Sequence, residues 1–282
     1  MTYYRPTDLT DAFEILAQSG ARILAGGTDV FPAETGRELR GEVLDITAIS
    51  ELGGITRTKD GWRIGATATW SDVITAPLPP AFNALQQAAR EVGSLQIQNS
   101  GTVAGNLCNA SPAADGVPPL LVLDAMVEIG SGRGVRHLPL SEFIKGVRNT
   151  ALEPDEIVTA IHVPQAAING VSAFQKLGAR KYLVISICMV AARIKLVDGV
   201  ISDAAISVGA CGPVASRLTA LETELVGANI SNPSAWHDTI ERQITTVLTP
   251  IDDIRADARY RITAATELVN STIIDAIQAH AT

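Results

Sequence analysis

The sequence predicts an α+β fold in two parts, a glycine-loop domain followed by a C-terminal domain of strands and then helices. Strand-like and helix-like segments are mixed up to about residue 165, strand-like segments follow between 172 and 209, and the remainder is mostly helical in pattern. Pro164 and the small residues after it, up to Gly170, form the best boundary. We therefore expect a first domain at 1–165 and a smaller α+β domain at 170–282.

The first part starts with a predicted helix over 11–18, with Thr10 as its N-cap and Gly20 just beyond its end. An Asp60-Gly61 turn predicts a hairpin of 54–57 with 62–66. The remaining predicted strands and helices of this part are strands at 22–25, 43–46 and 156–163, helices at 81–92 and 118–123, and a hairpin of 125–130 with 135–138.

In the second part, strands are predicted over 172–177, 184–197 and 204–209, with a turn at Asp198-Gly199. Helical spacing predicts a helix over 218–225 and a mostly helical tail over 236–281.

Composition limits the classes of function. The formal net charge of −8 argues against a general binder of nucleic acid or of anionic membranes, because both need an excess of Lys and Arg. The longest nearly apolar run, 183–192, is far shorter than the ~20 residues that span a bilayer. The first nine residues also lack the apolar stretch of a signal peptide. We expect a cytoplasmic protein with neither a nucleic-acid nor a membrane partner.

Catalytic and metal-binding side chains are not grouped in the sequence. Cys108, Cys188 and Cys211 are widely spaced and form no CxxC motif, which indicates neither a disulfide framework nor a zinc or iron–sulfur site. The four histidines show no metal-ligand spacing, and we interpret them as ordinary surface or strand residues. Cys108 is interpreted as a packing residue. We therefore assign no catalytic and no metal-binding residue.

Two glycine-containing segments carry the functional prediction. Residues 101–115, GTVAGNLCNASPAAD, combine glycines with short polar side chains and predict an irregular loop whose backbone N–H groups cradle a ligand. Residues 23–31, ILAGGTDVF, predict a strand that runs into a phosphate-binding turn. Each segment alone is also typical of an ordinary surface turn. The second segment matches neither the GxGxxG fingerprint nor a P-loop.

Taken together, the segments resemble the FAD-binding medium subunit of the molybdenum hydroxylases, the family of xanthine dehydrogenase and carbon monoxide dehydrogenase. The matching pieces, which cover nearly the whole chain, are AGGTD at 25–29, TVAGN at 102–106, SPAAD at 111–115, EIVTAIHVP at 156–164 and FQKLGARKYLVIS at 174–186. One position departs from the family pattern. Ala104 replaces a glycine that the family usually has, which puts the tightness of the pyrophosphate contact in doubt.

The resemblance implies one FAD, held in a domain of two α/β subdomains. The residues that would cradle its pyrophosphate are Ala25, Gly26, Gly27, Thr28 and Asp29 with Thr102, Val103, Ala104, Gly105 and Asn106. It further implies that Asp115 accepts bonds from sugar or ribityl hydroxyls, that Lys176 stabilises charge on reduced flavin, and that Val158 and Tyr182 lie against the cofactor. For Asp115, Lys176 and Val158 an ordinary structural role is the alternative, namely a helix cap, a solvated strand-end charge and strand core, respectively.

The resemblance also implies an electron-transfer subunit. It would work with an iron–sulfur subunit and a molybdenum-cofactor subunit, and would pass electrons through FAD to an external acceptor. Two alternatives stay open at this point, a stand-alone flavin oxidoreductase and a scaffolding subunit with a decayed flavin site.

Overall fold

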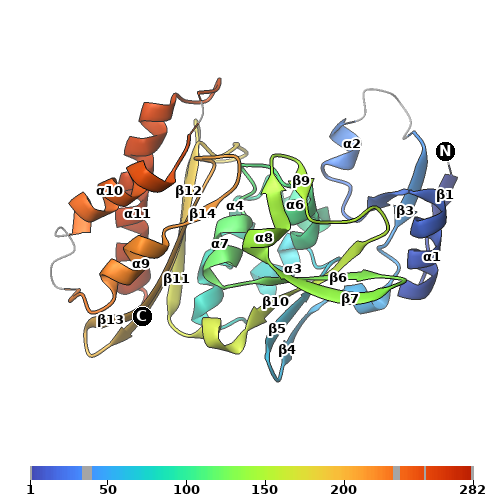
Figure 1. Cartoon of the computed structure of the whole chain (residues 1–282), viewed down its shortest axis with the longest axis horizontal. Coiled ribbons are helices and arrows are strands. Elements are labelled where there is room, and N and C mark those ends of the chain that lie inside the picture. Colours follow the sequence, from blue (N-terminus) through green and yellow to red (C-terminus); the bar gives the residue numbers. More distant parts are fainter. Residues whose placement is uncertain (1, 34–39, 231–235, 251, 281–282) are drawn as a thin grey trace.

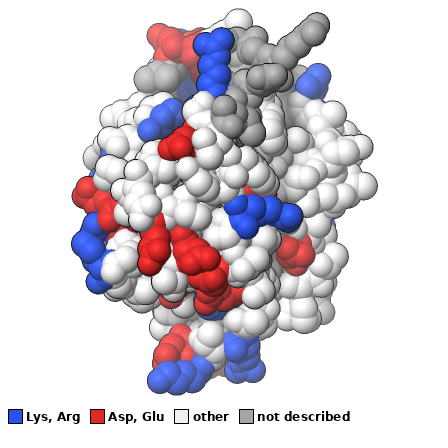
Figure 2. Space-filling model, turned by 90° about the vertical axis from the view of Figure 1, so that its right-hand side faces the viewer, with Lys and Arg blue, Asp and Glu red and all other residues white. Residues whose placement is uncertain are grey.

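The computed structural model describes residues 2–33, 40–230, 236–250 and 252–280. Three sheets follow one another along its longest axis, with the N-terminal sheet at one end and the C-terminal sheet at the other (Figure 1). Acidic and basic side chains are interspersed on the face at the N-terminal end (Figure 2). None of the described helices combines the length and apolar character needed to cross a membrane.

The N-terminal sheet is parallel, in the order β1 (Thr2–Tyr4), β3 (Glu42–Asp45), β2 (Arg22–Leu24). Helix α1 (Leu9–Ser19) buries Ala12 and Leu16, and the short α2 (Val30–Ala33) follows β2. The predicted N-cap Thr10 is wrong, because the Asp8 side chain accepts the hydrogen bond from the Asp11 N–H and starts α1 earlier. Gly20 ends the helix as predicted, with φ 61°.

The middle sheet has five antiparallel strands. Their order is β4 (Ile55–Thr58), β5 (Gly61–Gly65), β10 (Ile157–Pro164), β6 (Met126–Ser131), β7 (Gly134–Pro139). The two hairpins are confirmed, but Thr58 pairs with Gly61, so the first turn consists of Lys59 and Asp60, one residue earlier than predicted. Strand β10 lies between the hairpins and joins them.

Short helices connect these strands. They are α3 (Trp70–Thr75), α4 (Asn83–Glu91), α5 (Leu95–Ser100), α6 (Val103–Asn109), α7 (Val117–Val122) and α8 (Leu140–Phe143), with 3-10 turns at Ser50–Leu52, Pro80–Phe82 and Gln165–Ile168 and a small hairpin of β8 (Ile144–Gly146) with β9 (Asn149–Thr150). Helices α4 and α7 confirm predicted helices. Helices α3, α5 and α6 were not predicted, because six or seven residues are too few for a readable helical period.

The C-terminal sheet is antiparallel. It contains β11 (Val171–Leu177), β12 (Cys188–Val197), β13 (Val200–Gly209) and β14 (Ser216–Arg217). Strand β12 was expected to begin at residue 184. It begins at Cys188, which pairs with Leu177, the last residue of β11, so residues 184–187 lie beyond the end of the neighbouring strand. The predicted turn is confirmed, with φ 52° at Asp198 and 77° at Gly199.

Three helices end the described chain: α9 (Thr219–Leu225), α10 (His237–Val247) and α11 (Ala258–Gln278). They confirm the mostly helical tail, of which residues 251 and 281 lie outside the described residues. These helices cover the outer face of the C-terminal sheet, and α4 and α7 cover its inner face (Figure 1).

The apolar core is divided in the same way. One large core fills the first two sheets and their helices, and a second lies between the C-terminal sheet and its helices. A small third cluster, with several alanines, joins α4 and α7 to the C-terminal strands. The predicted α+β class, with a larger first part followed by a smaller α+β part, is confirmed. The boundary between 165 and 170 stays a prediction.

Candidate functional site

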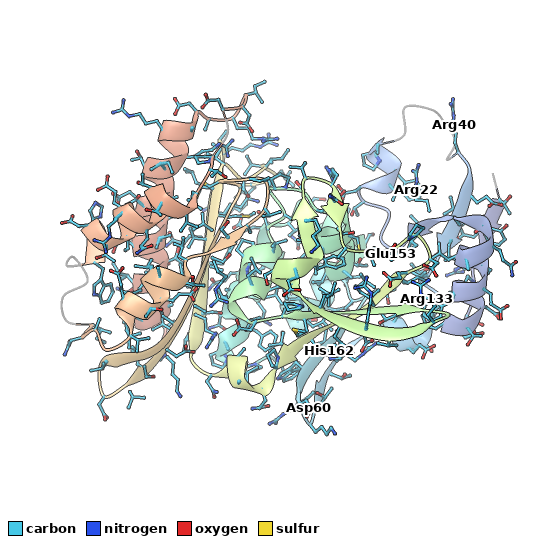
Figure 3. All side chains as sticks on the ribbon, viewed as in Figure 1. Arg22, Arg40, Asp60, Arg133, Glu153 and His162 are labelled. Atoms are coloured by element: carbon cyan, nitrogen blue, oxygen red, sulfur yellow. The ribbon has the colours of Figure 1, made fainter. Side chains whose placement is uncertain are left out.

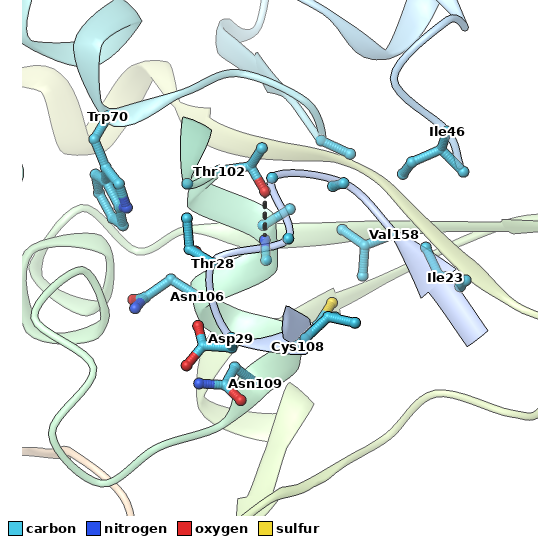
Figure 4. A pocket seen from close by; sticks show the side chains of 18 of the residues that line it. Ile23, Thr28, Asp29, Ile46, Trp70, Thr102, Asn106, Cys108, Asn109 and Val158 are labelled. Atoms are coloured by element: carbon cyan, nitrogen blue, oxygen red, sulfur yellow. Dashed lines mark hydrogen bonds between the residues drawn. The ribbon is translucent and has the colours of Figure 1, made fainter. Parts of the chain in front are cut away.

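A cavity of about 460 Å³ opens where the segment after β2 meets the N-terminus of α6 (Figure 4). Its walls include both glycine-containing segments, and Ile157 and Val158 from the central strand β10. Segments that are more than 70 residues apart in the chain therefore form one site. Ten of the predicted cofactor residues line it: Ala25, Gly26, Gly27, Thr28, Asp29, Thr102, Ala104, Gly105, Asn106 and Val158.

Glycines allow the two segments to touch. A Cβ atom on Gly26 would lie 1.9 Å from the carbonyl oxygen of Ser100 and 2.9 Å from the Cα atom of Gly101. Both contacts are with backbone, which cannot move aside. Gly27 in addition has φ 70°, a conformation that other residues rarely adopt. These positions therefore need glycine for close approach.

Residues 101–115 are not one irregular loop, as we had expected, because α6 occupies their first half. Thr102 is its N-cap, and its Oγ1 accepts a hydrogen bond of 3.0 Å from the Gly105 N–H. The N–H groups of Trp70 and Val103 donate to the carbonyls of Gly101 (3.1 Å) and Ala68 (3.0 Å) and hold the start of the helix against the α3 turn. A capped helix start thus replaces the predicted loop.

Unpaired backbone donors collect at this junction. Within the described chain, the N–H groups of Gly26, Gly27, Thr28 and Ala104 have no hydrogen-bond acceptor in the protein. The first N–H groups of a helix carry partial positive charge, and successive free N–H groups in a turn form a concavity for anions. The arrangement suits phosphate oxygens without any Lys or Arg among the lining residues.

The two ends of the cavity differ in character (Figure 4). Thr28, Asp29, Asn106 and Asn109 lie together at one end, and the apolar side chains of Ile23, Ile46 and Val158 lie toward the other. Asn106 Oδ1 is buried and has no hydrogen-bond partner. A buried oxygen of this kind is costly unless a ligand donates to it. The cavity thus fits a ligand with phosphate and hydroxyl groups at one end and flat apolar rings at the other, as in FAD.

The alanine at position 104 leaves the cavity open. Its side chain is 3% exposed and packs into the large core, so its methyl group takes little of the cavity surface. Val103, another predicted cofactor residue, is fully buried and does not line the cavity. Gly105 does line it, and a Cβ there would meet only Thr102 within 3.9 Å.

Three further predicted residues lie outside this cavity. Asp115 and Lys176 form a buried ion pair of 2.5 Å, and Ser186 Oγ donates to the other oxygen of the Asp115 carboxylate, also at 2.5 Å. Burial raises the pKa of Asp115 above its usual value, although the Lys176 and Ser186 contacts oppose the rise. The pair connects the segment before α7 to strand β11, and so joins the first domain to the C-terminal sheet.

A second cavity, of about 570 Å³, lies beside this ion pair. Its lining includes four basic residues, Lys176, Arg90, Arg180 and Lys181, and one acidic residue, Glu91. Tyr182 lines neither cavity; it is 63% exposed, and the Lys181 ammonium lies 5.2 Å from its ring centre.

The sequence analysis missed several lining residues, of which Cys108 is the most informative. It was interpreted as packing, yet its side chain is open to the cavity, and burial by the surrounding walls raises the pKa of its thiol to about 12. Cys108 and Asn109 lie one turn after Gly105 and Asn106, on the same face of α6. Recognition of the helix would have found both. The other missed residues, including Trp70 and Leu152, come from elements distant in sequence.

Known families match both parts of the chain. Residues 1–166 match the FAD binding domain in molybdopterin dehydrogenase, and residues 172–276 match the CO dehydrogenase flavoprotein C-terminal domain.

Individual relatives match over most of their length. The xanthine dehydrogenase FAD-binding subunit of Escherichia coli O157:H7 is 32% identical over 283 residues, 99% of this chain and 96% of the relative. The nicotinate dehydrogenase FAD-subunit of Eubacterium barkeri is 36% identical over 81% of this chain and 80% of its own. A chain of carbon monoxide dehydrogenase from Hydrogenophaga pseudoflava superimposes with a TM-score of 0.90 at 27% identity, covering 99% of this chain and 97% of that one.

Proposed function

The chain belongs to the FAD-binding medium subunits of molybdenum hydroxylase-type oxidoreductase complexes, and from this premise we propose that it works as an electron relay. It would receive electrons from iron–sulfur clusters on a partner subunit, in a complex with a molybdenum-cofactor subunit, and pass them to an external acceptor. When bound, FAD supplies the electron-accepting chemistry, and the protein supplies its position and its electrostatic surroundings.

The observation that carries the proposal is the group of free N–H donors where Gly26–Thr28 meet the start of α6. We assign the pyrophosphate to this junction, with the backbone of residues 25–29 and 102–106 around it. The Asn106 side-chain oxygen, which has no partner in the protein, would accept a hydrogen bond from the cofactor, and Val158 would pack against its apolar part. The roles inferred for Asp115, Lys176 and Tyr182 stay predictions.

The chemistry of the cavity wall favours a relay over a stand-alone oxidoreductase. Of the residues that line the first cavity, only Asp29 and Cys108 are ionisable. The raised pKa of Cys108 keeps it a neutral thiol at neutral pH, a weak nucleophile and a poor base. A complete oxidoreductase for organic substrates would need acid and base groups beside the flavin. A decayed site is disfavoured too, because Ala104 does not fill the cavity.

The purified chain, free of molybdenum and iron, tests the proposal. We expect it to bind one FAD, and we expect a chemical donor such as dithionite to bleach the flavin absorbance. We also expect no oxidation of a purine, an aldehyde or an N-heterocycle without partners. Turnover of such a substrate by the single chain would support the stand-alone alternative, and failure to take up FAD would support the scaffold.

A further inference from the structure

Three metal-ligating side chains meet on the solvent face of the middle sheet, away from the cofactor cavity. They are Glu128 on β6, His137 on β7 and His162 on β10, three adjacent strands. Their neighbours along the strands, such as Val127 and Ile161, point into the large core, as strand alternation requires. Figure 3 labels His162 on β10. The histidines are 25 residues apart in sequence, so no motif spacing reveals the group.

The distances within the group are short. One carboxylate oxygen, Glu128 Oε2, lies 2.8 Å from His162 Nε2 and 3.4 Å from His137 Nε2. The ligand atoms of all three side chains lie within 4.8 Å of one another. Ligands that are about 2.0–2.2 Å from a tetrahedral Zn²⁺ are about 3.4 Å from each other. The three atoms therefore need only small rotamer adjustments to share one ion.

A neighbouring hydroxyl orients the carboxylate. The pairing register of β10 with β6 shifts between Val158 and Ala160. Thr159, which lies between these two residues, donates a hydrogen bond of 2.7 Å from its Oγ1 to Glu128 Oε1. This bond leaves Oε2 directed at the imidazoles. The carboxylate is thus fixed in orientation, as metal ligands with supporting hydrogen bonds are.

We propose that Glu128, His137 and His162 form a binding site for a divalent transition-metal ion, with Zn²⁺ as the ion that best fits two imidazoles and one carboxylate. His137 has a side chain 47% exposed and His162 one 28% exposed, so water has access to complete the coordination. A bound ion would tie β6, β7 and β10 together on the solvent side of the sheet. The site shares no residue with the proposed FAD cradle and does not depend on it.

Arg63 limits the affinity. Its Nη2 lies 3.9 Å from Glu128 Oε1, and its positive charge opposes a cation nearby. The same nitrogen also donates to the carbonyl oxygens of Glu51 (3.2 Å) and Thr159 (3.3 Å), which hold it on the Oε1 side, away from the Oε2 atom that faces the histidines. We therefore expect a dissociation constant for Zn²⁺ in the micromolar range, weaker than that of a closed four-ligand zinc site.

The test is a Zn²⁺ titration of the FAD-loaded full chain, without a polyhistidine tag and stripped with a chelator, by isothermal titration calorimetry at pH 7.5. We expect one ion per chain. The variants His137→Gln and His162→Gln should each weaken binding at least tenfold. His237→Gln, which removes a histidine on α10 outside the group, should leave binding unchanged.

Circular dichroism and flavin content must match the parent in each variant, which separates loss of the ligand from loss of the fold. Because the His137 side chain is nearly half exposed, we expect His137→Gln to disturb the fold less than His162→Gln. Absence of stoichiometric Zn²⁺ binding by the parent, or equal binding by the parent and the His137→Gln variant, would overturn the proposal.

Discussion

At the scale of single residues, the cavity depends on glycines, which have no side chain. Gly26 lets its segment contact the backbone of Ser100 and Gly101, and Gly105 leaves open the space in front of the first turn of α6. The contribution of each glycine is steric, so the effect of a substitution follows from where its Cβ would point. Gly105 is the clearest test, because a side chain there would enter the cavity.

For Gly105→Val we expect FAD to bind at least tenfold more weakly. The new Cβ would lie 2.7 Å from Thr102 Oγ1 and disturb the N-cap, which is worth about 1 kcal/mol. Its two methyl groups would extend into the space assigned to the pyrophosphate. Fluorescence titration of the refolded apoprotein with FAD measures the change.

Gly132→Val is the matched control, since Gly132 is exposed in the β6–β7 turn and a Cβ there meets no atom within 4 Å. It should bind FAD like the parent. If Gly105→Val also binds FAD like the parent, the start of α6 is not the cradle.

At the scale of elements, the sequence predicts long or patterned segments well and short capped ones poorly. The hairpins at β4–β5 and β6–β7 and the tail helices follow from turn residues and periodicity. Helix α6 has seven residues, and its glycine and asparagines resemble loop composition, so only its N-cap marks it. The residue types of the two glycine-containing segments were enough to predict that both belong to the site. Residues such as Trp70 and Leu152 reach the cavity only through tertiary packing, which local pattern cannot show.

The ion pair that joins β11 to the first domain gives a second prediction. In Lys176→Met, Asp115 keeps its buried position but loses its partner, and breaking a buried pair costs about 3 kcal/mol. The pKa of Asp115 is already raised, so ionising it opposes folding, and its contribution to stability falls as pH rises from about 4 to the folded-state pKa. Without Lys176 that pKa rises further. The destabilisation relative to the parent should therefore be larger at pH 7.5 than at pH 5.

Urea unfolding of the FAD-free variant and parent at both pH values measures this difference. Lys195→Met on β12 is the control, because Lys195 has no ion pair among the described residues. Equal destabilisation by Lys176→Met at the two pH values would show that lost packing, and not the charge of Asp115, is responsible.

At the scale of the whole molecule, the residues between β11 and β12 expose an apolar surface beside the second cavity. Tyr182, Leu183 and Ile185 are each more than half exposed, and Val184 between them lines that cavity. Grouped exposed apolar side chains of this kind often mark protein interfaces. They are where we expect a partner subunit to approach.

Ile185→Asp should weaken assembly with the partner subunits at least tenfold, because a charge would be buried at the interface. Its FAD content should not change. Co-purification of the partners with a tagged chain measures assembly. Val135→Asp, a similarly exposed site on β7, should assemble normally. Normal assembly of the Ile185→Asp variant would exclude this surface as the interface.

The central position of β10 sets an order of events during synthesis. Hairpins β4–β5 and β6–β7 can form as soon as each leaves the ribosome, but the strand between them, residues 157–164, is made last. That strand also carries Ile157 and Val158 of the cavity wall. Pairings so distant in sequence form slowly. We therefore expect the nascent chain to load its cofactor only after translation has passed residue 164, and not when the two glycine segments emerge.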